Sequence, residues 1–132
     1  MALIDDDAAA FEPLSRAYAI PKDAPERAAV MEEALKTACR PPMEMARRCA
    51  EMVELMSELA EKGSAIAVSD VGVGAQLARA ALLSAELNVR INAKSMGDRD
   101  CAQALLRELD ALEEKYVPLA ETAYAHVLTR IG

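Results

Sequence analysis

The chain has 132 residues, a length that suits one domain with a single hydrophobic core. Its 15 Lys and Arg stand against 22 Asp and Glu, and the net charge of −7 argues against general nucleic-acid binding, which requires a basic surface. No stretch resembles a signal peptide or a run of about 20 apolar residues, so we expect a soluble cytoplasmic protein that binds no membrane.

The composition predicts an all-α protein. Hydrophobic residues make up 53% of the chain and aromatic residues only 3%, with 28 alanines and 7 methionines, which favours helices that approach one another closely. We expect a bundle of about five helices and no strand, over approximately residues 3–18, 23–40, 42–62, 69–95 and 98–131.

Prolines define the first helix boundaries. Pro21 ends the first helix, because a proline disfavours helical geometry in the residue before it. The second helix is expected to open at Asp23, with Glu26 completing a pattern similar to a capping box. Pro41 and Pro42 should separate the second helix from the third.

Other residues predict the later boundaries. Gly63 should stop the third helix, and Asp98 should cap the fifth. Pro118 should kink or interrupt the fifth helix. The only histidine, His126, lies near the end of that helix and suits a surface or packing role better than catalysis.

The cysteines indicate a reducing compartment. Cys39, Cys49 and Cys101 are odd in number and widely spaced, which suits reduced thiols better than a disulfide framework or a metal site. We expect each to be a small buried residue.

The segment 69–95 is the most informative part of the chain. Ser69 or Asp70 can cap its start. Alternating four- and three-residue steps place a small and then polar stripe on one face: Gly74, Ala78, Ala81, Ala85, Asn88 and Asn92. Large apolar residues flank this stripe and should pack into the core: Val73, Leu77, Leu83, Leu87 and Ile91. The two amides, with Arg90 and Lys94 one turn apart, need partners or a ligand.

Four sequence strings together resemble the cyclodeaminase/cyclohydrolase family of folate enzymes. They are LIDDDAAAF, YAIPKD, PPMEMAR and SDVGVGAQLARAALLSAELNVRINAKSM, in that order along the chain. The resemblance implies a single helical domain over 1–132 that corresponds to the C-terminal two-thirds of a family domain. It also implies a homodimer, and a tetrahydrofolate derivative as substrate with no permanently bound cofactor. Family members carry a further N-terminal portion with a glycine-rich turn, which has no counterpart in this sequence.

The chemistry of such enzymes points to carboxylates. Cyclodeaminases close 5-formiminotetrahydrofolate to the 5,10-methenyl form with loss of ammonia, and cyclohydrolases open that ring with water. Both reactions pass through a cationic carbon, so an anionic side chain can stabilise the charge and move a proton, and no metal is required. Asp7 and Asp5 match acidic positions of the family motif, and Asp7 should point inward with Leu3 and Phe11. Asp70 is the third candidate, and helix capping is its alternative role.

The substrate-binding candidates lie on the helix 69–95. Asn88 and Asn92 could bond the pterin ring or hold the carboxylate, or they could bond another helix. Arg90 and Lys94 could meet the glutamate tail of folate, or form ion pairs on a solvated face. Two hypotheses follow from the sequence: an enzyme of the cyclodeaminase or cyclohydrolase type, and a non-catalytic, N-terminally shortened interaction module of the same family.

Overall fold

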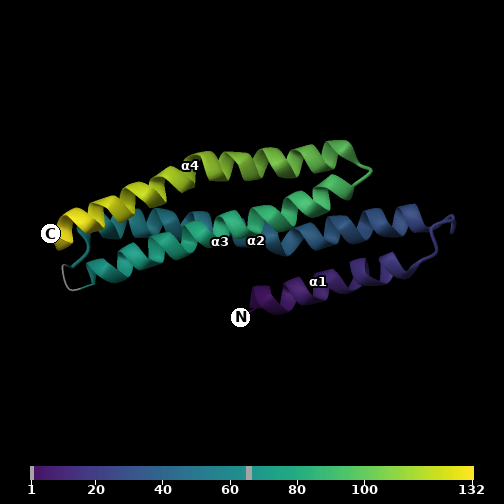
Figure 1. Ribbon diagram of the computed structural model, residues 1–132, viewed down its shortest axis with the longest axis horizontal. Helices are drawn as coiled ribbons and strands as arrows, with labels where there is room; N and C mark the ends of the chain where they lie inside the picture. Colours follow the sequence, from purple (N-terminus) through teal and green to yellow (C-terminus); the bar gives the residue numbers. More distant parts are fainter. Residues whose placement is uncertain (1, 65–66) are drawn as a thin grey trace.

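The computed structural model describes residues 2–64 and 67–132, which form four helices and no strand, so the all-α prediction is confirmed (Figure 1). The helices are α1 (Ala2–Ala19), α2 (Arg27–Lys62), α3 (Val68–Ser95) and α4 (Arg99–Ile131). None of the helices in these ranges is long and apolar enough to cross a membrane.

The predicted break at Pro41 and Pro42 is wrong, because α2 runs through both prolines, and the described residues form four helices where five were expected. Both prolines are buried, and the flanking Cys39 and Met43 are each 1% exposed in core clusters with α3 and α4. Proline has a helix-compatible φ, so its cost is a lost N–H and a clash with the preceding turn. The burial of Cys39 before the two prolines and of Met43 after them outweighs that cost.

Two predicted caps are also wrong. The second helix opens at Arg27 rather than at Asp23, and its N-cap residue Glu26 makes no side-chain capping bond. The helix α3 begins at Val68, after Ala67, without a side-chain cap. Ser69 and Asp70 therefore lie inside the first turn rather than at its cap.

The end of α2 and the start of α4 agree with the prediction. Gly63 follows the last residue of α2 and donates its N–H to the Leu59 carbonyl oxygen at 2.7 Å. Asp98 caps α4, where its Oδ1 accepts a bond from the Cys101 N–H at 3.0 Å. Pro118 lies inside α4 and does not interrupt it, and the helix changes direction near the middle of its length (Figure 1).

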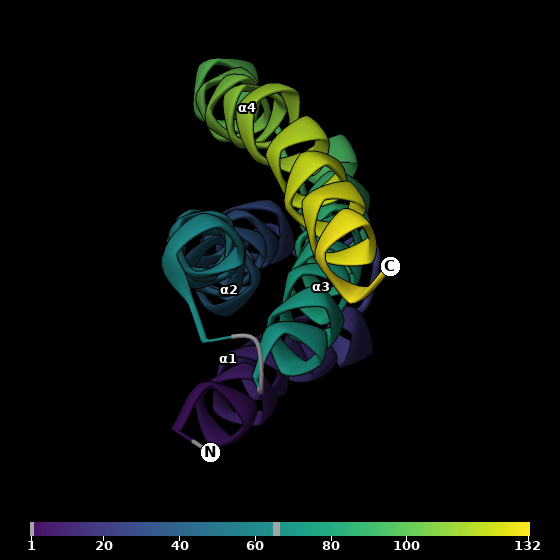
Figure 2. The same ribbon diagram turned by 90° about the vertical axis from the view of Figure 1, so that its left-hand side faces the viewer.

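The helices are arranged around the pair α2 and α3. Viewed end-on, α2 and α3 lie side by side, with α4 on one side of the pair and α1 on the other (Figure 2). The helix α4 packs on both α2 and α3, whereas the backbone of α1 contacts only α2. A groove is therefore left between α1 and α3, with α2 at its floor.

The core is built largely from small residues. About half of the buried apolar residues are alanines. A Cβ atom added to Gly72 would lie 3.0 Å from Val127 Cγ1, and one added to Gly74 would lie 2.8 Å from Met56 Sδ. These glycines allow α3 to approach α4 and α2 closely, as the alanine-rich composition predicts. Cys39 and Cys49 are buried and Cys101 is half-buried, and none is in a disulfide.

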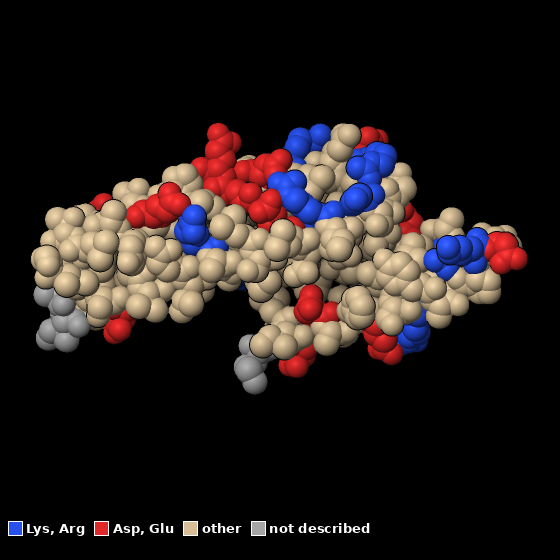
Figure 3. Space-filling model, viewed as in Figure 1, with Lys and Arg blue, Asp and Glu red and all other residues tan. Residues whose placement is uncertain are grey.

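One face of α3 is apolar and exposed, which overturns the prediction that its large residues pack into the core. Val73 is 58%, Leu77 65%, Leu87 68% and Ile91 67% exposed. Helical spacing places these four side chains on one face, which is turned away from both α2 and α4. Only Leu83, at a neighbouring position, is half-buried. Around the start of α3 and the end of α4, the molecular surface carries few charges (Figure 3).

Candidate active site

Two adjoining cavities lie in the groove between α1, α2 and α3, and Asp7 and Asn88 line both of them. The first, of about 260 Å³, is here called the polar cavity; it is lined by Asp7, Phe11, Leu14, Tyr18, Ala38, Asn88, Ile91, Asn92 and Ser95. The second, of about 170 Å³, is called the proline cavity; it is lined by Leu3, Ile4, Asp7, Pro41, Pro42, Met45 and Asn88. Asp7 and Asn88 therefore stand at the junction.

Helical spacing explains how these side chains come together. On α1, Leu3, Asp7 and Phe11 follow one another at four-residue steps and so share a face. On α3, Asn88 and Asn92 are one turn apart. Because α1 and α3 lie on either side of the groove, the Asp7 face of α1 and the Asn88 face of α3 line the same cavities above α2.

Asp7 borders the groove but is exposed, so the prediction that it points into the protein interior is wrong. The face of α1 that carries Asp7 lines the two cavities rather than a packed core. Phe11, on the same face, is 57% exposed. The carboxylate is therefore open to a ligand that enters the groove.

The asparagines are available for bonding. Asn88 is exposed and Asn92 is half-buried. Within residues 2–64 and 67–132, neither side-chain amide has a hydrogen-bond partner, although each offers two donors and an acceptor. The alternative that they bond another helix of this chain finds no support in the described part of the structure.

The other two carboxylate candidates lie outside the junction. Asp5 is exposed and lines neither cavity. Asp70 is exposed in the first turn of α3, at the opposite end of that helix from Asn92. The structure thus brings Asp7, Asn88 and Asn92 together and leaves Asp5 and Asp70 apart from them.

The two cationic candidates also lie apart from the cavities. Arg90 is bound on the α4 side, with Nε 2.5 Å from Glu86 Oε1 and Nη2 2.5 Å from Asp110 Oδ1. These hydrogen bonds, first that of Glu86, raise the pKa of the Arg90 guanidinium above its usual value. Lys94 is exposed and lines neither cavity. The ion-pair alternative for Arg90 therefore describes its surroundings.

A third carboxyl group, that of Glu113 on α4, lies near Glu86 and Asp110. Burial, followed by the nearby Glu86 carboxylate, raises the pKa of Glu113. The Glu113 Oε1 atom is buried and has no hydrogen-bond partner in the described ranges. The ionised form of the Glu113 carboxyl group therefore destabilises the folded state. Glu113 lies outside both cavities.

Several cavity residues were not selected from the sequence. Tyr18 and Ser95 add hydroxyl groups to the polar cavity. Pro41 and Pro42 form the wall of the proline cavity. Tyr18, Pro41 and Pro42 belong to the motifs YAIPKD and PPMEMAR, which carry part of the family resemblance.

The carboxylate and the two amides at the cavities can take part in acid and base chemistry and in binding. A carboxylate at the junction can stabilise a positive charge on a bound molecule and can accept a proton. The amides beside it can fix the orientation of a polar ring. Fold and cavities together define an all-α domain with an open site for a small, cationic or polar ligand.

Comparison with known proteins gives the family of this domain. The model of the Formiminotransferase-cyclodeaminase family matches residues 1–111. The chain is 41% identical to a methenyltetrahydrofolate cyclohydrolase from Methylorubrum extorquens, over 98% of this chain and 64% of that protein. It is 35% identical to the formimidoyltransferase-cyclodeaminase of Sus scrofa, over 98% of this chain and 24% of that protein. The chain therefore belongs to the Formiminotransferase-cyclodeaminase family, as its motifs predicted.

A solved structure agrees with this assignment. The crystal structure of a formiminotetrahydrofolate cyclodeaminase from Thermotoga maritima matches with a TM-score of 0.80 and 29% sequence identity. The match covers 98% of this chain and 60% of the Thermotoga chain. This chain thus spans somewhat less than two thirds of the length of the Methylorubrum and Thermotoga proteins that it matches.

Proposed function

We propose that this chain is a folate one-carbon enzyme that opens the 5,10-methenyl ring of tetrahydrofolate with water. The observation that carries the proposal is the junction of the two cavities, where the Asp7 carboxylate and the Asn88 amide meet. The methenyl carbon is cationic and joins two ring systems, so it suits a site that joins two cavities and carries an anion.

Asp7 supplies the acid and base chemistry in this proposal. Its carboxylate stabilises the cationic carbon and accepts a proton from the attacking water. The water oxygen bonds to the methenyl carbon, and the bond between that carbon and N5 breaks. N5 takes up one proton of the water, and the other proton is released, which leaves a formyl group on N10. Asn88 positions the substrate beside the carboxylate.

The cyclohydrolase reaction is favoured over the cyclodeaminase reaction by sequence similarity. The relative with 41% identity is a cyclohydrolase, whereas the Sus scrofa and Thermotoga proteins, whose names give cyclodeaminase activity, are 35% and 29% identical. In the alternative reaction the same carboxylate would give a proton to departing ammonia instead of taking one from water. The two activities are separated by assaying both substrates.

A non-catalytic interaction module is the second candidate. It is favoured by the exposed apolar face of α3, which carries Val73, Leu77, Leu87 and Ile91. Apolar patches of this kind mark surfaces that another protein covers. We propose a homodimer in the cytoplasm, where the three unpaired cysteines stay reduced.

The decisive experiment follows the absorbance of 5,10-methenyltetrahydrofolate with the purified chain, against buffer alone. Decay faster than spontaneous ring opening, and lost in the Asp7→Asn variant, supports the enzyme. A rate equal to that of buffer contradicts the proposal for this chain and favours the interaction module.

A further inference from the structure

A third cavity adjoins the two cavities of the groove and lies between α1 and α2, without a residue of α3 in its lining. The third, here called the arginine cavity, is lined by Leu3, Asp6, Ala10, Thr37, Arg40, Pro41 and Glu44. It shares Leu3 and Pro41 with the proline cavity, which in turn shares Asp7 and Asn88 with the polar cavity. The proline cavity therefore lies between the other two.

We propose that this row sets the direction of the substrate, with the pterin ring in the polar cavity, the benzoyl ring in the proline cavity and the glutamate carboxylates at Arg40. The proposal rests on the proposed function, since it takes a tetrahydrofolate as the ligand. The one-carbon unit joins N5 of the pterin to N10 of the benzoyl group, so it lies at the junction occupied by Asp7 and Asn88.

The polarity of the linings decides which ring enters which cavity. A pterin carries N–H groups, ring nitrogens and a carbonyl, which need hydrogen-bond partners when they leave water. The polar cavity offers the hydroxyls of Tyr18 and Ser95 and the amide of Asn92. These three groups can donate and accept bonds around the edge of one planar ring.

A backbone feature adds to this polarity. In an ordinary helix, the residue at position 42 donates its N–H to the carbonyl oxygen of residue 38. Pro42 has no N–H to donate, and Ala38 lines the polar cavity. Pro42 thus leaves the carbonyl oxygen of Ala38 without its usual helical donor, and we infer that a pterin N–H can bind to it.

The proline cavity suits a benzene ring. Apart from the shared Asp7 and Asn88, its lining consists only of apolar side chains: Leu3, Ile4, Pro41, Pro42 and Met45. Such a wall gives a benzoyl ring apolar contacts, and the Met45 thioether can contact the ring favourably. A pterin in the same place would leave its polar edge without partners.

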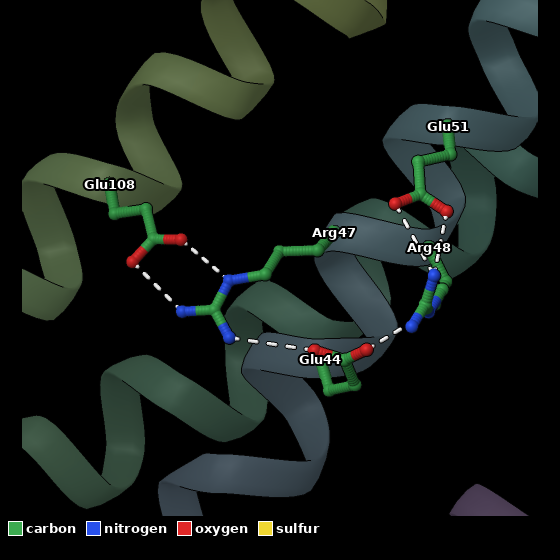
Figure 4. Close-up of polar contacts among 5 residues, drawn as sticks. All are labelled: Glu44, Arg47, Arg48, Glu51 and Glu108. Atoms are coloured by element: carbon green, nitrogen blue, oxygen red, sulfur yellow. Dashed lines mark hydrogen bonds and ion pairs between the residues drawn. The ribbon is translucent and has the colours of Figure 1, made fainter.

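Three cations line the arginine cavity or the cavity beside it, namely Lys36, Arg40 and Arg47, and of these only Arg40 has no ion pair among the described residues. Lys36 is bound to Asp98, with Nζ 2.9 Å from Oδ2. Arg47 binds Glu108 through two bonds of 2.7 and 3.0 Å and also lies 3.6 Å from Glu44 (Figure 4).

The acidic neighbours leave the Arg40 guanidinium available. Glu44 is held by Arg48, whose Nε lies 2.9 Å from Oε1 (Figure 4). Asp6 lines the same cavity without an ion pair to Arg40. In the ranges that the structure describes, Arg40 has no ion-pair partner, and it is exposed. A guanidinium is well shaped to bind a carboxylate through two bonds.

The test uses two fragments of the substrate with the whole 132-residue chain. Calorimetry or ligand-observed NMR measures the dissociation constants of a tetrahydropterin without the benzoyl group and of 4-aminobenzoylglutamate without the pterin. We expect Asn92→Ala to weaken tetrahydropterin binding about fivefold and to leave 4-aminobenzoylglutamate unchanged. Arg40→Gln should do the opposite, weakening 4-aminobenzoylglutamate binding about fivefold. The exposed Arg107→Gln, on α4, is the matched control and should change neither.

The outcomes separate this inference from the proposed function. The reversed pattern, equal effects on both fragments, or no binding of either fragment to the unaltered chain would overturn the orientation. If turnover is normal and any of these results is found, the proposed function is retained and the proposed orientation of the substrate is rejected. The expected selectivity without turnover supports the orientation and removes the catalytic proposal. Circular dichroism of each variant confirms that it is folded.

Discussion

Asp7 on α1 and Asn88 on α3 line the same two cavities although they are far apart in the sequence and their helix backbones are not in contact. Both side chains are exposed and face the groove above α2. An exposed pair of this kind contributes little to packing, so substitutions there test function separately from folding.

The Asp7→Asn variant should lose turnover and remain stable. Loss of a group that moves protons costs about 10² to 10⁴ in kcat. The free energy of unfolding should stay within about 0.5 kcal/mol, because the side chain is exposed. Steady-state kinetics and thermal melting measure the two effects. Glu12→Gln, an exposed acid on the same helix that lines neither cavity, is the control. Unchanged kcat in Asp7→Asn would exclude Asp7 as the acid and base.

Part of the candidate site could be predicted from the sequence, because family motifs and helical spacing can be recognised within a short stretch of chain. The stripe on α3 placed Asn88 and Asn92 on one face, and the structure has them in one cavity. What the sequence could not give is pairing across helices. The sequence makes Arg90 a candidate for the substrate tail, whereas the structure has it bound to Asp110 of α4. The sequence gives no sign that Arg40 is available, because its lack of an ion pair among the described residues depends on where distant acids lie.

The fold shows the same division between local and tertiary effects. The prolines Pro41 and Pro42 predict a break by a sound local rule, yet packing of α2 against the other three helices keeps the helix continuous. The periodicity of α3 predicts that Leu77 and Leu87 flank the small stripe and pack into the core, whereas the structure leaves both exposed. Periodicity cannot tell what covers such a face, and in this structure nothing in the described ranges does.

The Glu113→Gln variant should be more stable than the unaltered protein near neutral pH. Burial and the Glu86 carboxylate raise the pKa of Glu113 in the folded state, so its ionised form opposes folding. The folded state then binds more protons than the unfolded state, and stability falls as pH rises from the unfolded to the folded pKa. Glutamine removes the charge, and we expect a gain of roughly 1 kcal/mol at neutral pH.

Thermal melts between mildly acidic and neutral pH measure this effect. The difference between Glu113→Gln and the unaltered protein should shrink as the buffer becomes more acidic, where the carboxyl is protonated. Arg90, whose charge lowers the pKa of Glu113, and Asp110, whose charge raises it, are unaltered in both proteins. The exposed neighbour Glu114→Gln should change stability by less than about 0.5 kcal/mol at any pH. A pH-independent difference would contradict the assigned cause.

The cysteines should differ in reactivity. Burial, and secondarily Cys101, raises the pKa of the Cys39 thiol to about 11, and burial also raises the pKa of Cys49. Because the thiolate is the reactive form, a thiol reagent at neutral pH should label both slowly in the folded protein. Cys101 is half-buried and should be labelled first. Mass spectrometry of a time course gives the order, and denaturant should make all three equally fast. Rapid labelling of Cys39 in the native protein would show that α2 opens locally.

The exposed apolar face of α3 should make the chain associate with itself. Leu77 and Leu87 are 65% and 68% exposed, and burying such side chains stabilises a complex by about 1.5 to 3 kcal/mol each. Light scattering after gel filtration should therefore give a dimer for the unaltered chain and a monomer for the double variant Leu77→Asp, Leu87→Asp. Val30→Asp, at a 41% exposed position on α2 away from this face, should stay dimeric. A monomer before substitution would contradict a homodimer through α3. In that case binding of a hydrophobic dye, lost in the double variant, would show that the same face is free for a different partner.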